Sequence, residues 1–301
     1  MNTPSFNIAA VERDTGLSKD VLRVWERRYG FPVPDSDSNG ERCYPAEQVD
    51  RLRLIKRLMD LGHRPGKLIA TPLDELSELA PRRSKAPALA VPASHEGLDE
   101  LLTLIKQHDA ASYQQAMQQR LARQGLQHFV QDTVAPLTGK VGEYWEDGRF
   151  EVFEEHLFTE LTNRLLRQAI STLPSGTRGP RVLLTSVPDE VHFLGLLMVE
   201  SLFTLEGAEC IALGTQMPLL EIGRAAEAHQ ADIVALSFSG AFPQRQIPGL
   251  LQHLRLVLPK EAALWAGGSG VARVAKIDGV GLFNTLDDAL AALAMWRTQH
   301  G

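Results

Sequence analysis

The stretch from Arg181 to Phe283 restricts the possible fold more than any other feature of the chain. Short apolar runs recur there, each followed by a segment with helical spacing; they are RVLLTSV, ECIALG, DIVALSF, ALWAG and GVGLF. Strands buried on both faces of a parallel sheet show continuous apolar runs rather than an alternating pattern. The repeated strand–helix units therefore predict a doubly wound, parallel-sheet α/β domain over residues 178–301, Rossmann-like and of the flavodoxin type.

The loop after the first of these strands is the first place to look for a site. Ligands of such sheets bind beyond the carboxyl ends of the strands, at the switch point. A nucleotide-binding domain would carry G-x-G-x-x-G in this loop, whereas the chain has PDEVHFLG. Glu190 precedes His192 by two residues, and a metal-bound histidine commonly donates its other N–H to a carboxylate. The loop thus favours metal ligation, with a plain surface histidine as the alternative.

Residues 1–80 predict a helix-turn-helix. Ser18 can cap a helix that follows the tight turn TGLS. On this second helix Lys19, Arg23 and Arg27 are spaced four residues apart and line one stripe. A solvated basic face is the bland interpretation of such a stripe. On the second helix of a helix-turn-helix, however, it predicts contact with DNA.

A hairpin is expected after this helix. Asn39-Gly40 is a strong signal for a two-residue hairpin turn, and Arg42 and Tyr44 follow at the period of a strand. A hairpin beside a recognition helix is a wing. We expect Arg42 to reach phosphate or the minor groove, and Tyr44 to pack or to donate a hydrogen bond to phosphate.

These segments together resemble the winged helix-turn-helix of MerR-type regulators. The shared features are WERRYG in the recognition helix, the NG-x-R-x-Y wing and the following helix RLxxIKxLxxxG. The resemblance covers roughly residues 6–75. It implies that the partner of this region is a double-stranded DNA operator.

Two further segments separate this head from the α/β domain. Residues 81–95, PRRSKAPALAVPASH, are rich in Pro and Ala and predict a linker. Residues 96–177 carry four helical patterns with breaks at Gly125, Pro136 and Gly148. They predict a four-helix bundle. The whole chain is therefore expected to be a multidomain protein.

The α/β domain resembles the cobalamin-binding domain of methionine synthases and mutases. The pattern D/E-x-H-x-x-G, S-x-L, GG is carried here by Glu190, His192, Gly195, Ser237, Gly267 and Gly268. The resemblance implies that His192 is the lower cobalt ligand and that Ser237 lines the slot of the nucleotide tail. Glycines there would let the backbone approach that tail closely. Ser239 replaces the Leu of the pattern, so looser packing of the tail is expected.

The bundle carries a third resemblance. Trp145 is followed after nine residues by Glu155 and His156, which resembles the W-x9-EH motif of the CarH/LitR family of light-responsive cobalamin regulators. That family has the same order of head, bundle and cobalamin domain. The resemblance implies that adenosylcobalamin binds with these three residues at its upper face, that a tetramer represses, and that light disassembles it. A core tryptophan and an exposed Glu-His pair are the alternatives.

One position departs from this family. Its members have a histidine directly after the tryptophan, which caps cobalt once the upper group is lost, and this chain has Glu146 instead. The nearest other histidine is His156. The resemblance therefore does not extend to a second imidazole ligand.

Composition limits the class of protein. The formal net charge of −6 argues against binding of polyanions over the whole surface. No apolar run approaches the roughly 20 residues that cross a bilayer, and the N-terminus lacks signal-peptide features. Cys43 and Cys210 are too few for a disulfide framework. We expect a cytoplasmic homo-oligomer, dimer or tetramer, without membrane contact.

Two other functions stay open at this stage. A bundle joined to a cobalamin domain also forms the methyl-carrying module of methyltransferases, so a corrinoid carrier is one alternative. Such carriers do not need the winged head, and no constellation of catalytic residues predicts an enzyme. The other alternative is a regulator that kept the fold and lost the cofactor, against which the intact spacing of Glu190, His192 and Gly195 speaks.

Overall fold

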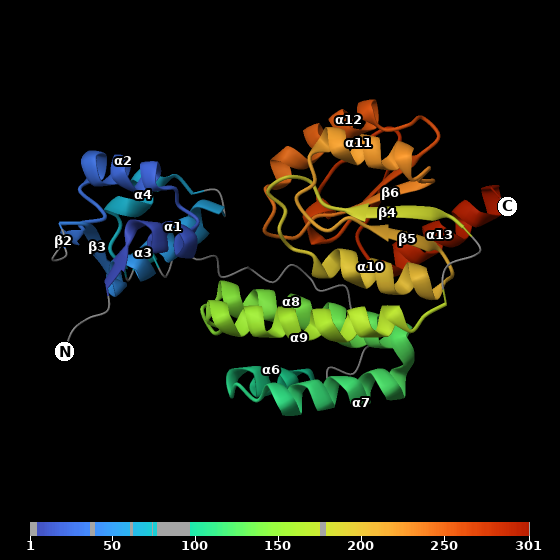
Figure 1. Ribbon diagram of the computed structural model, residues 1–301, viewed down its shortest axis with the longest axis horizontal. Coiled ribbons are helices and arrows are strands. Elements are labelled where there is room, and N and C mark those ends of the chain that lie inside the picture. The colour runs from blue at the N-terminus through green and yellow to red at the C-terminus, as the bar shows by residue number, and fades with distance from the viewer. Residues whose placement is uncertain are drawn as a thin grey trace. The chain divides into compact units, whose positions relative to one another are not determined.

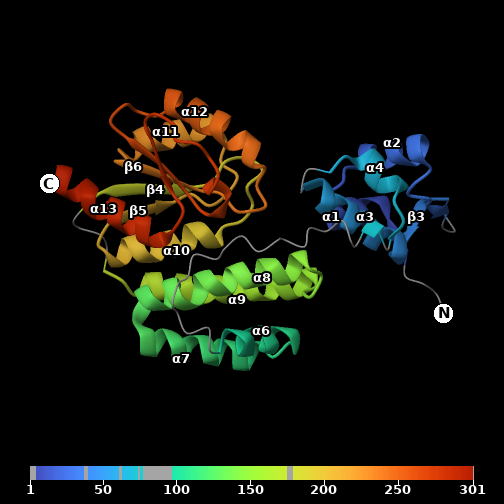
Figure 2. The same ribbon diagram turned by 180° about the vertical axis from the view of Figure 1, so that it is seen from behind.

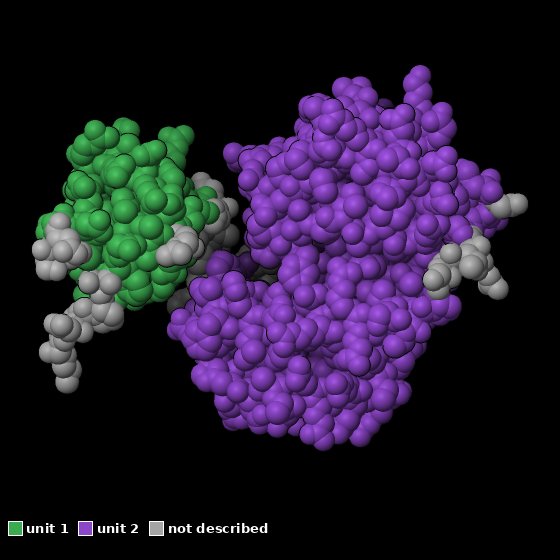
Figure 3. All heavy atoms as spheres, in the orientation of Figure 1, with its two compact units in different colours: residues 1–86 green, residues 87–301 purple. Residues whose placement is uncertain are grey.

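The chain forms two compact units, residues 1–86 and 87–301, which Figure 3 colours separately. The structure, a computed structural model, describes residues 5–36, 40–60, 63–73, 75–76, 97–174 and 179–300. The expected linker at 81–95 and the expected boundary at 177/178 both lie outside the described residues. Each unit is therefore treated by itself.

The first unit is a helix-turn-helix with a small sheet (Figure 1). Its elements are β1 Ser5–Asn7, α1 Ile8–Thr15, α2 Lys19–Tyr29, β2 Asp35–Ser36, β3 Arg42–Pro45, α3 Ala46–Asp60 and α4 Pro65–Ala70. Gly16 ends α1 at a φ of 69°, and the Ser18 side chain accepts the Val21 N–H to begin α2. These are the helix signals that the sequence carries, and the helix-turn-helix is confirmed.

The hairpin is present, but its register differs from the expected one. β2 and β3 pair antiparallel with Ser36 opposite Arg42. A two-residue turn at Asn39-Gly40 would set Ser36 opposite Cys43 instead. The connection from Ser36 to Arg42 therefore has an odd number of residues. The expected two-residue turn is wrong, and the register of the described strands differs from the expected one by one residue. Asn39 itself lies outside the described part of the chain, and Gly40 has a φ of 75°.

The second unit begins with the helical bundle. Its elements are α6 Leu98–Lys106, α7 Ala110–His128, the π-helical segment η1 Phe129–Val134, α8 Ala135–Glu146 and α9 Val152–Ser171. Gly125 interrupts α7 with φ 73° and ψ 162°, and Gly148 lies in the turn between α8 and α9. Pro136 does not end the helical run; it lies in the first turn of α8, directly after the π-helical segment. The expected bundle is confirmed.

The rest of the second unit is the parallel sheet, with five strands in described residues 179–300. They are β4 Arg181–Thr185, β5 Glu209–Ala212, β6 Ile233–Ser237, β7 Ala263–Gly267 and β8 Val280–Phe283, and they run in the order β5-β4-β6-β7-β8. The helices are α10 Leu194–Leu205, α11 Leu219–Ala228, α12 Ile247–Val257 and α13 Leu286–His300. This is the flavodoxin-type order, so the predicted domain is confirmed. Its switch point lies between β4 and β6.

The two faces of the sheet have separate cores. On β4, Val182 and Leu184 belong to the cluster that includes α10 and α13, whereas Leu183 belongs to the cluster of α11 and α12. Figures 1 and 2 show the two helix pairs on opposite faces. Continuous apolar strands result from this double burial. No helix in the described ranges is long and apolar enough to cross a membrane.

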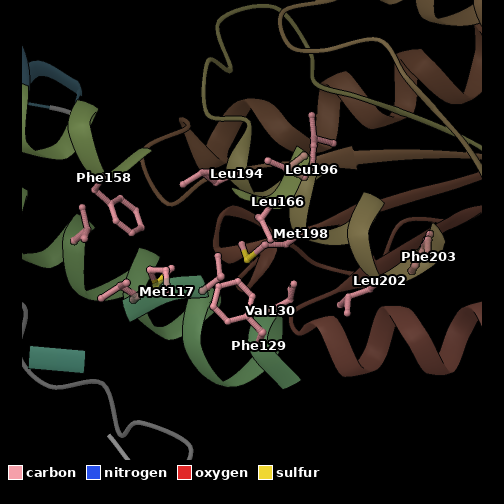
Figure 4. Packing of buried hydrophobic residues seen from close by; sticks show 14 of the residues in the cluster. Met117, Phe129, Val130, Phe158, Leu166, Leu194, Leu196, Met198, Leu202 and Phe203 are labelled. Atoms are coloured by element: carbon pink, nitrogen blue, oxygen red, sulfur yellow. The ribbon is translucent and has the colours of Figure 1, made fainter. Parts of the chain in front are cut away.

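The bundle packs against the sheet domain through α10. Phe129 and Leu166 of the bundle belong to the same buried cluster as Met198 of α10, and Figure 4 shows their side chains meeting. At the edge of this contact, Nη1 of Arg167 lies 2.8 and 2.6 Å from the two carboxylate oxygens of Glu200. The bundle and the sheet therefore share one core.

Candidate functional site

The loop after β4 holds a histidine against a buried carboxylate. His192 Nδ1 lies 2.7 Å from Glu190 Oε1, and the His192 backbone N–H donates to the same oxygen at 3.0 Å. Glu190 is 1% exposed, whereas the His192 side chain is 54% exposed. The carboxylate is thus fixed inside the loop, and the ring carries its other nitrogen, Nε2, toward the surface.

Ser239, in the loop after β6, holds the other side of Glu190. Its backbone N–H donates to Glu190 Oε2 at 2.7 Å, and its hydroxyl donates to the same oxygen at 2.9 Å. The substitution of Ser for Leu in the S-x-L pattern therefore has a polar role that the sequence did not indicate. Glu190 lies in the loop after β4, and Ser239 lies in the loop after β6. These are the two strands on either side of the switch point.

The contact between Glu190 and His192 shifts the pKa of both side chains, down for Glu190 and up for His192. Burial alone would raise the pKa of Glu190, but hydrogen bonds from His192 and from the Ser239 N–H outweigh it and hold the pKa below its ordinary value. The hydrogen bond to Glu190 raises the pKa of His192, burial opposes that rise, and the charges of Glu190 and Glu155 add to it. An imidazole whose Nδ1 faces a carboxylate is a better donor to a metal through Nε2.

Two glycines allow close packing near the carboxyl ends of the strands. A Cβ at Gly195 would overlap the Ser237 hydroxyl, so this glycine lets α10 approach the end of β6. Gly268 has a φ of 101°, and a Cβ there would overlap the Phe238 carbonyl oxygen. Gly267 is less restricted, because its nearest neighbour would lie 3.4 Å from a Cβ.

Gly270 is a site glycine that the sequence analysis missed. A Cβ there would lie 2.6 Å from the carbonyl oxygen of Ser239, the residue that clamps Glu190. The signal was present in the run GGSG, of which only the first two glycines belong to the family pattern.

The predicted residues of the upper face lie on either side of the α8–α9 turn. Trp145 and Glu146 end α8, and Glu155 and His156 lie near the start of α9. The charge of Glu155 acts on His192, so the bundle and the β4 loop meet at this end of the unit. The Glu155 carboxylate accepts the Thr159 hydroxyl at 2.7 Å. His156 is 74% exposed, and Trp145 packs partly against the shared core.

In the first unit, the cations predicted for DNA contact are at least partly exposed. Arg23, Arg27 and Arg42 are exposed and Lys19 is half-buried. Tyr44 is fully buried, and its hydroxyl has no hydrogen-bond partner in the described residues. Of the two roles expected for Tyr44, packing is therefore the one that the structure shows. Arg42 and Tyr44 share one face of β3, but Arg42 is exposed at the first position of the strand, whereas Tyr44 is buried in the core cluster of this unit.

The sequence analysis also missed basic residues next to the recognition helix. Helix α4 packs at Gly66 against the ring of Tyr29, the last residue of α2. A Cβ at Gly66 would lie 3.1 Å from the Tyr29 hydroxyl. Arg28 is exposed on α2, Lys67 is exposed on α4, and Arg64 is exposed at the position that precedes α4. The segment HRPGK was the available signal, but only the packing of α4 on α2 brings it to the same surface.

Comparison with known proteins agrees with both units. Residues 6–69 match the family model described as MerR HTH family regulatory protein, and residues 98–170 match the B12 binding domain model. The class of protein is thus a MerR-type regulator with a B12-binding domain. The second match covers the helical bundle.

Relatives extend the match along the chain. The HTH-type transcriptional repressor CarH of Myxococcus xanthus is 30% identical over 271 residues, covering 89% of each chain. The HTH-type transcriptional repressor CarA of the same organism is 26% identical over 257 residues, covering 85% of this chain and 84% of CarA. The chain therefore belongs to the CarH/CarA family of transcriptional repressors, which are not enzymes.

A solved structure supports the fold of the second unit. The monomethylamine corrinoid protein of Methanosarcina barkeri covers 67% of this chain over all of its own length, with 16% identity and a TM-score of 0.53. At that identity the likeness concerns the fold alone.

The residues at the switch point fit a cobalamin. In the described residues no three His, Cys, Asp or Glu side chains form a group that could hold a metal ion. A corrin ring brings four nitrogen ligands of its own and needs one imidazole from the protein. His192 carries an imidazole whose Nδ1 is held by Glu190, so its Nε2 fits that requirement.

Tyr44→Phe tests the burial of the Tyr44 hydroxyl. Because this hydroxyl is buried without a partner in the described residues, its removal should raise the free energy of unfolding by about 1 kcal/mol. Affinity for DNA should not change. Chemical denaturation and a gel shift measure the two quantities. Weaker DNA binding at unchanged stability would place the hydroxyl at the interface after all.

Ser239→Ala tests the clamp on Glu190. The variant keeps the backbone hydrogen bond and loses the hydroxyl one, so the free energy of unfolding should fall by about 1–2 kcal/mol. Ser171→Ala is the control, because that exposed hydroxyl bonds only the Gln168 carbonyl of its own helix. Equal denaturation midpoints for both variants would contradict the clamp.

Proposed function

We propose that this chain is a repressor whose DNA binding and oligomerisation are controlled by adenosylcobalamin and by light. The observation that carries the proposal is the 2.7 Å contact between His192 Nδ1 and the buried Glu190 carboxylate. It fixes the ring and leaves Nε2 as the nitrogen for a metal. The oligomer would be a homo-dimer or a tetramer, and the DNA a double-stranded operator.

The lower side of the cofactor site would be built from the sheet domain. His192 would ligate cobalt, and Glu190 and Ser239 would hold its ring in place. Ser237 would line the slot of the nucleotide tail. The residues that let backbone approach that tail would be Gly195, Gly267 and Gly268.

The upper side would be built from the bundle. Trp145 would pack over the upper axial group, with Glu155 and His156 beside it. Bound adenosylcobalamin would supply a cobalt–carbon bond that light can break. Glu155 supports this assignment, because its charge raises the pKa of His192, which places this part of α9 near the β4 loop.

Helix α9 would connect the cofactor to the arrangement of the bundle. Its first turns carry Glu155, and its C-terminal half is tied to α10 by the ion pair of Arg167 with Glu200, whose carboxylate is 10% exposed. A change at the upper face would therefore act on an α9 that is anchored at its far end. If the bundle has two arrangements, a ligand that binds one of them more tightly raises the population of that arrangement. The size of the shift is set by the difference between the two binding free energies.

The recognition helix and the wing would bind a palindromic or direct-repeat operator. The DNA-contacting residues would be Lys19, Arg23, Arg27 and Arg42, with Arg28, Arg64 and Lys67 beside them. Arginine reads guanine through two parallel hydrogen bonds, and other cations bind phosphate without sequence preference.

His192→Ala tests the proposal as a whole. We expect the variant to lose adenosylcobalamin on desalting, or to hold it with a changed absorbance spectrum. Its affinity for an operator, selected from a random duplex pool, should no longer depend on cofactor or illumination. His229→Ala, an exposed histidine of the same domain, is the control. An unchanged spectrum and cofactor affinity in His192→Ala would overturn the ligand assignment.

The wild-type chain distinguishes the remaining alternatives in the same experiment. If its operator affinity does not respond to the cofactor that it retains, it is a carrier of corrinoid rather than a sensor. If it retains no cofactor, it is a cofactor-free regulator of the same fold.

Glu146→His tests the departure from the family. A carboxylate is a poor replacement for imidazole on cobalt, which favours nitrogen donors. The illuminated wild-type protein should therefore lack the spectrum of two imidazole ligands, and Glu146→His should gain it. Absorbance spectra before and after illumination measure this. A two-imidazole spectrum in the wild type that disappears in His156→Ala would instead make His156 the upper ligand.

A further inference from the structure

Three of the cations proposed to contact DNA already face carboxylates of their own chain. Lys19 Nζ lies 3.5 Å from Glu12 Oε2, Arg23 Nη1 lies 3.6 Å from Asp20 Oδ1, and Arg42 Nε lies 3.4 Å from Glu26 Oε2. The three pairs join cations and carboxylates on or beside the recognition helix. Arg27 is different, because it has no carboxylate partner in the described residues; its Nε donates to the Arg23 carbonyl.

The distances separate these three pairs from a structural ion pair in the same unit. Arg53 Nε donates to Asp14 Oδ1 at 3.0 Å, which is a hydrogen-bonded contact that ties α3 to α1. The three pairs on the recognition surface are all longer than the 2.7–2.9 Å that is usual for charge-assisted hydrogen bonds. They neutralise the cations without fixing them, so the cations can exchange partners.

Glu26 occupies the most restricted place of the three carboxylates. Its Oε2 is buried and has no hydrogen-bond partner in the described residues, and Arg42 of the wing is the cation nearest to it. A buried carboxylate oxygen without partners is costly. Glu26 therefore holds the Arg42 guanidinium by charge, and it joins the wing to the recognition helix when no other anion competes.

We propose that Glu26 and Asp20 are intramolecular competitors of DNA, which occupy Arg42 and Arg23 until a phosphate or a base edge displaces them. The guanidinium group recognises carboxylate and phosphate through the same pairs of N–H groups. Binding of the operator is then an exchange of partners, whereas on other duplexes the carboxylates keep the two cations neutralised. Both effects lower the affinity for DNA. This inference rests on the proposed function of the recognition surface. Glu12 is left out, because it also accepts the Lys19 backbone N–H.

The exchange predicts different salt dependences on two kinds of duplex. In a loose, non-specific complex the wild-type cations keep their carboxylates, so they release no counterions. Removal of a carboxylate charge would free one cation, and the slope of log K against log salt should steepen by about 0.9 on such DNA. On the operator the cation is already displaced toward DNA, so the slope should not change.

The test uses the full-length chain with Glu26→Gln and Asp20→Asn, each on the selected operator and on a scrambled duplex of equal composition. Each variant should bind the scrambled duplex about two- to fivefold more tightly at low salt. Glu47→Gln is the matched control, because Glu47 is exposed on α3 and has no ion pair in the described residues. Glu47→Gln removes one negative charge from the same unit, as the two test variants do. It should change the affinity for the scrambled duplex and the salt slope less than they do.

Arg42→Ala completes the design by linking Glu26 to its cation. In the Arg42→Ala background, Glu26→Gln should have no more effect than Glu47→Gln. If Glu26→Gln and Asp20→Asn match the control while Arg42→Ala still weakens binding, the competitor role is wrong and the DNA surface stands. If Arg42→Ala and Arg23→Ala also leave binding unchanged, the surface itself is wrong and both proposals fall.

Discussion

The hydrogen bonds of Glu190 are the constraint on which the cofactor site depends. A carboxylate that is 1% exposed loses its hydration, and that loss is offset here by N–H and O–H groups from two different loops. The loops meet because the strand order β5-β4-β6 leaves the ends of β4 and β6 adjacent where the chain direction changes sides. The buried Glu190 carboxylate thus joins the two loops at the switch point, and it fixes the direction of the His192 ring.

The shared core explains how an event at His192 can reach the rest of the unit. Helix α10 starts directly after the His192 loop and is buried between the sheet and the bundle. Close packing makes such an interface resist gradual deformation, so it moves between discrete arrangements. Helix α9 meets the loop near Glu155 and meets α10 at Arg167, and these two points lie on different turns of one rigid element. A displacement of the His192 loop is therefore passed to α9 at two separate points along its length.

Features set by local pattern were predictable, and features set by distant contacts were not. The apolar runs and the cap at Ser18 predicted strands and helices because period and capping act within a few residues. The burial of Tyr44 depends on how β3 packs on the helices of the head. Arg42 shares its face of the strand and is exposed, so a period of two cannot say which of the two residues is buried. The bond of Ser239 to Glu190 joins residues 49 apart, and only the fold brings them together. Resemblance named the site residues, but their geometry came from packing.

Two carboxylates, one in each unit, hold a neighbouring basic group in opposite ways. Glu190 is satisfied by several hydrogen bonds, and its 2.7 Å contact fixes His192, so a metal at Nε2 adds to the arrangement without breaking it. Glu26 has a buried oxygen without a hydrogen bond and lies 3.4 Å from Arg42, so a phosphate must replace it. The first contact suits a ligand that binds the ring without displacing its partner. The second suits a surface that has to release its partner, because an exchangeable pair lowers affinity while leaving the cation in place.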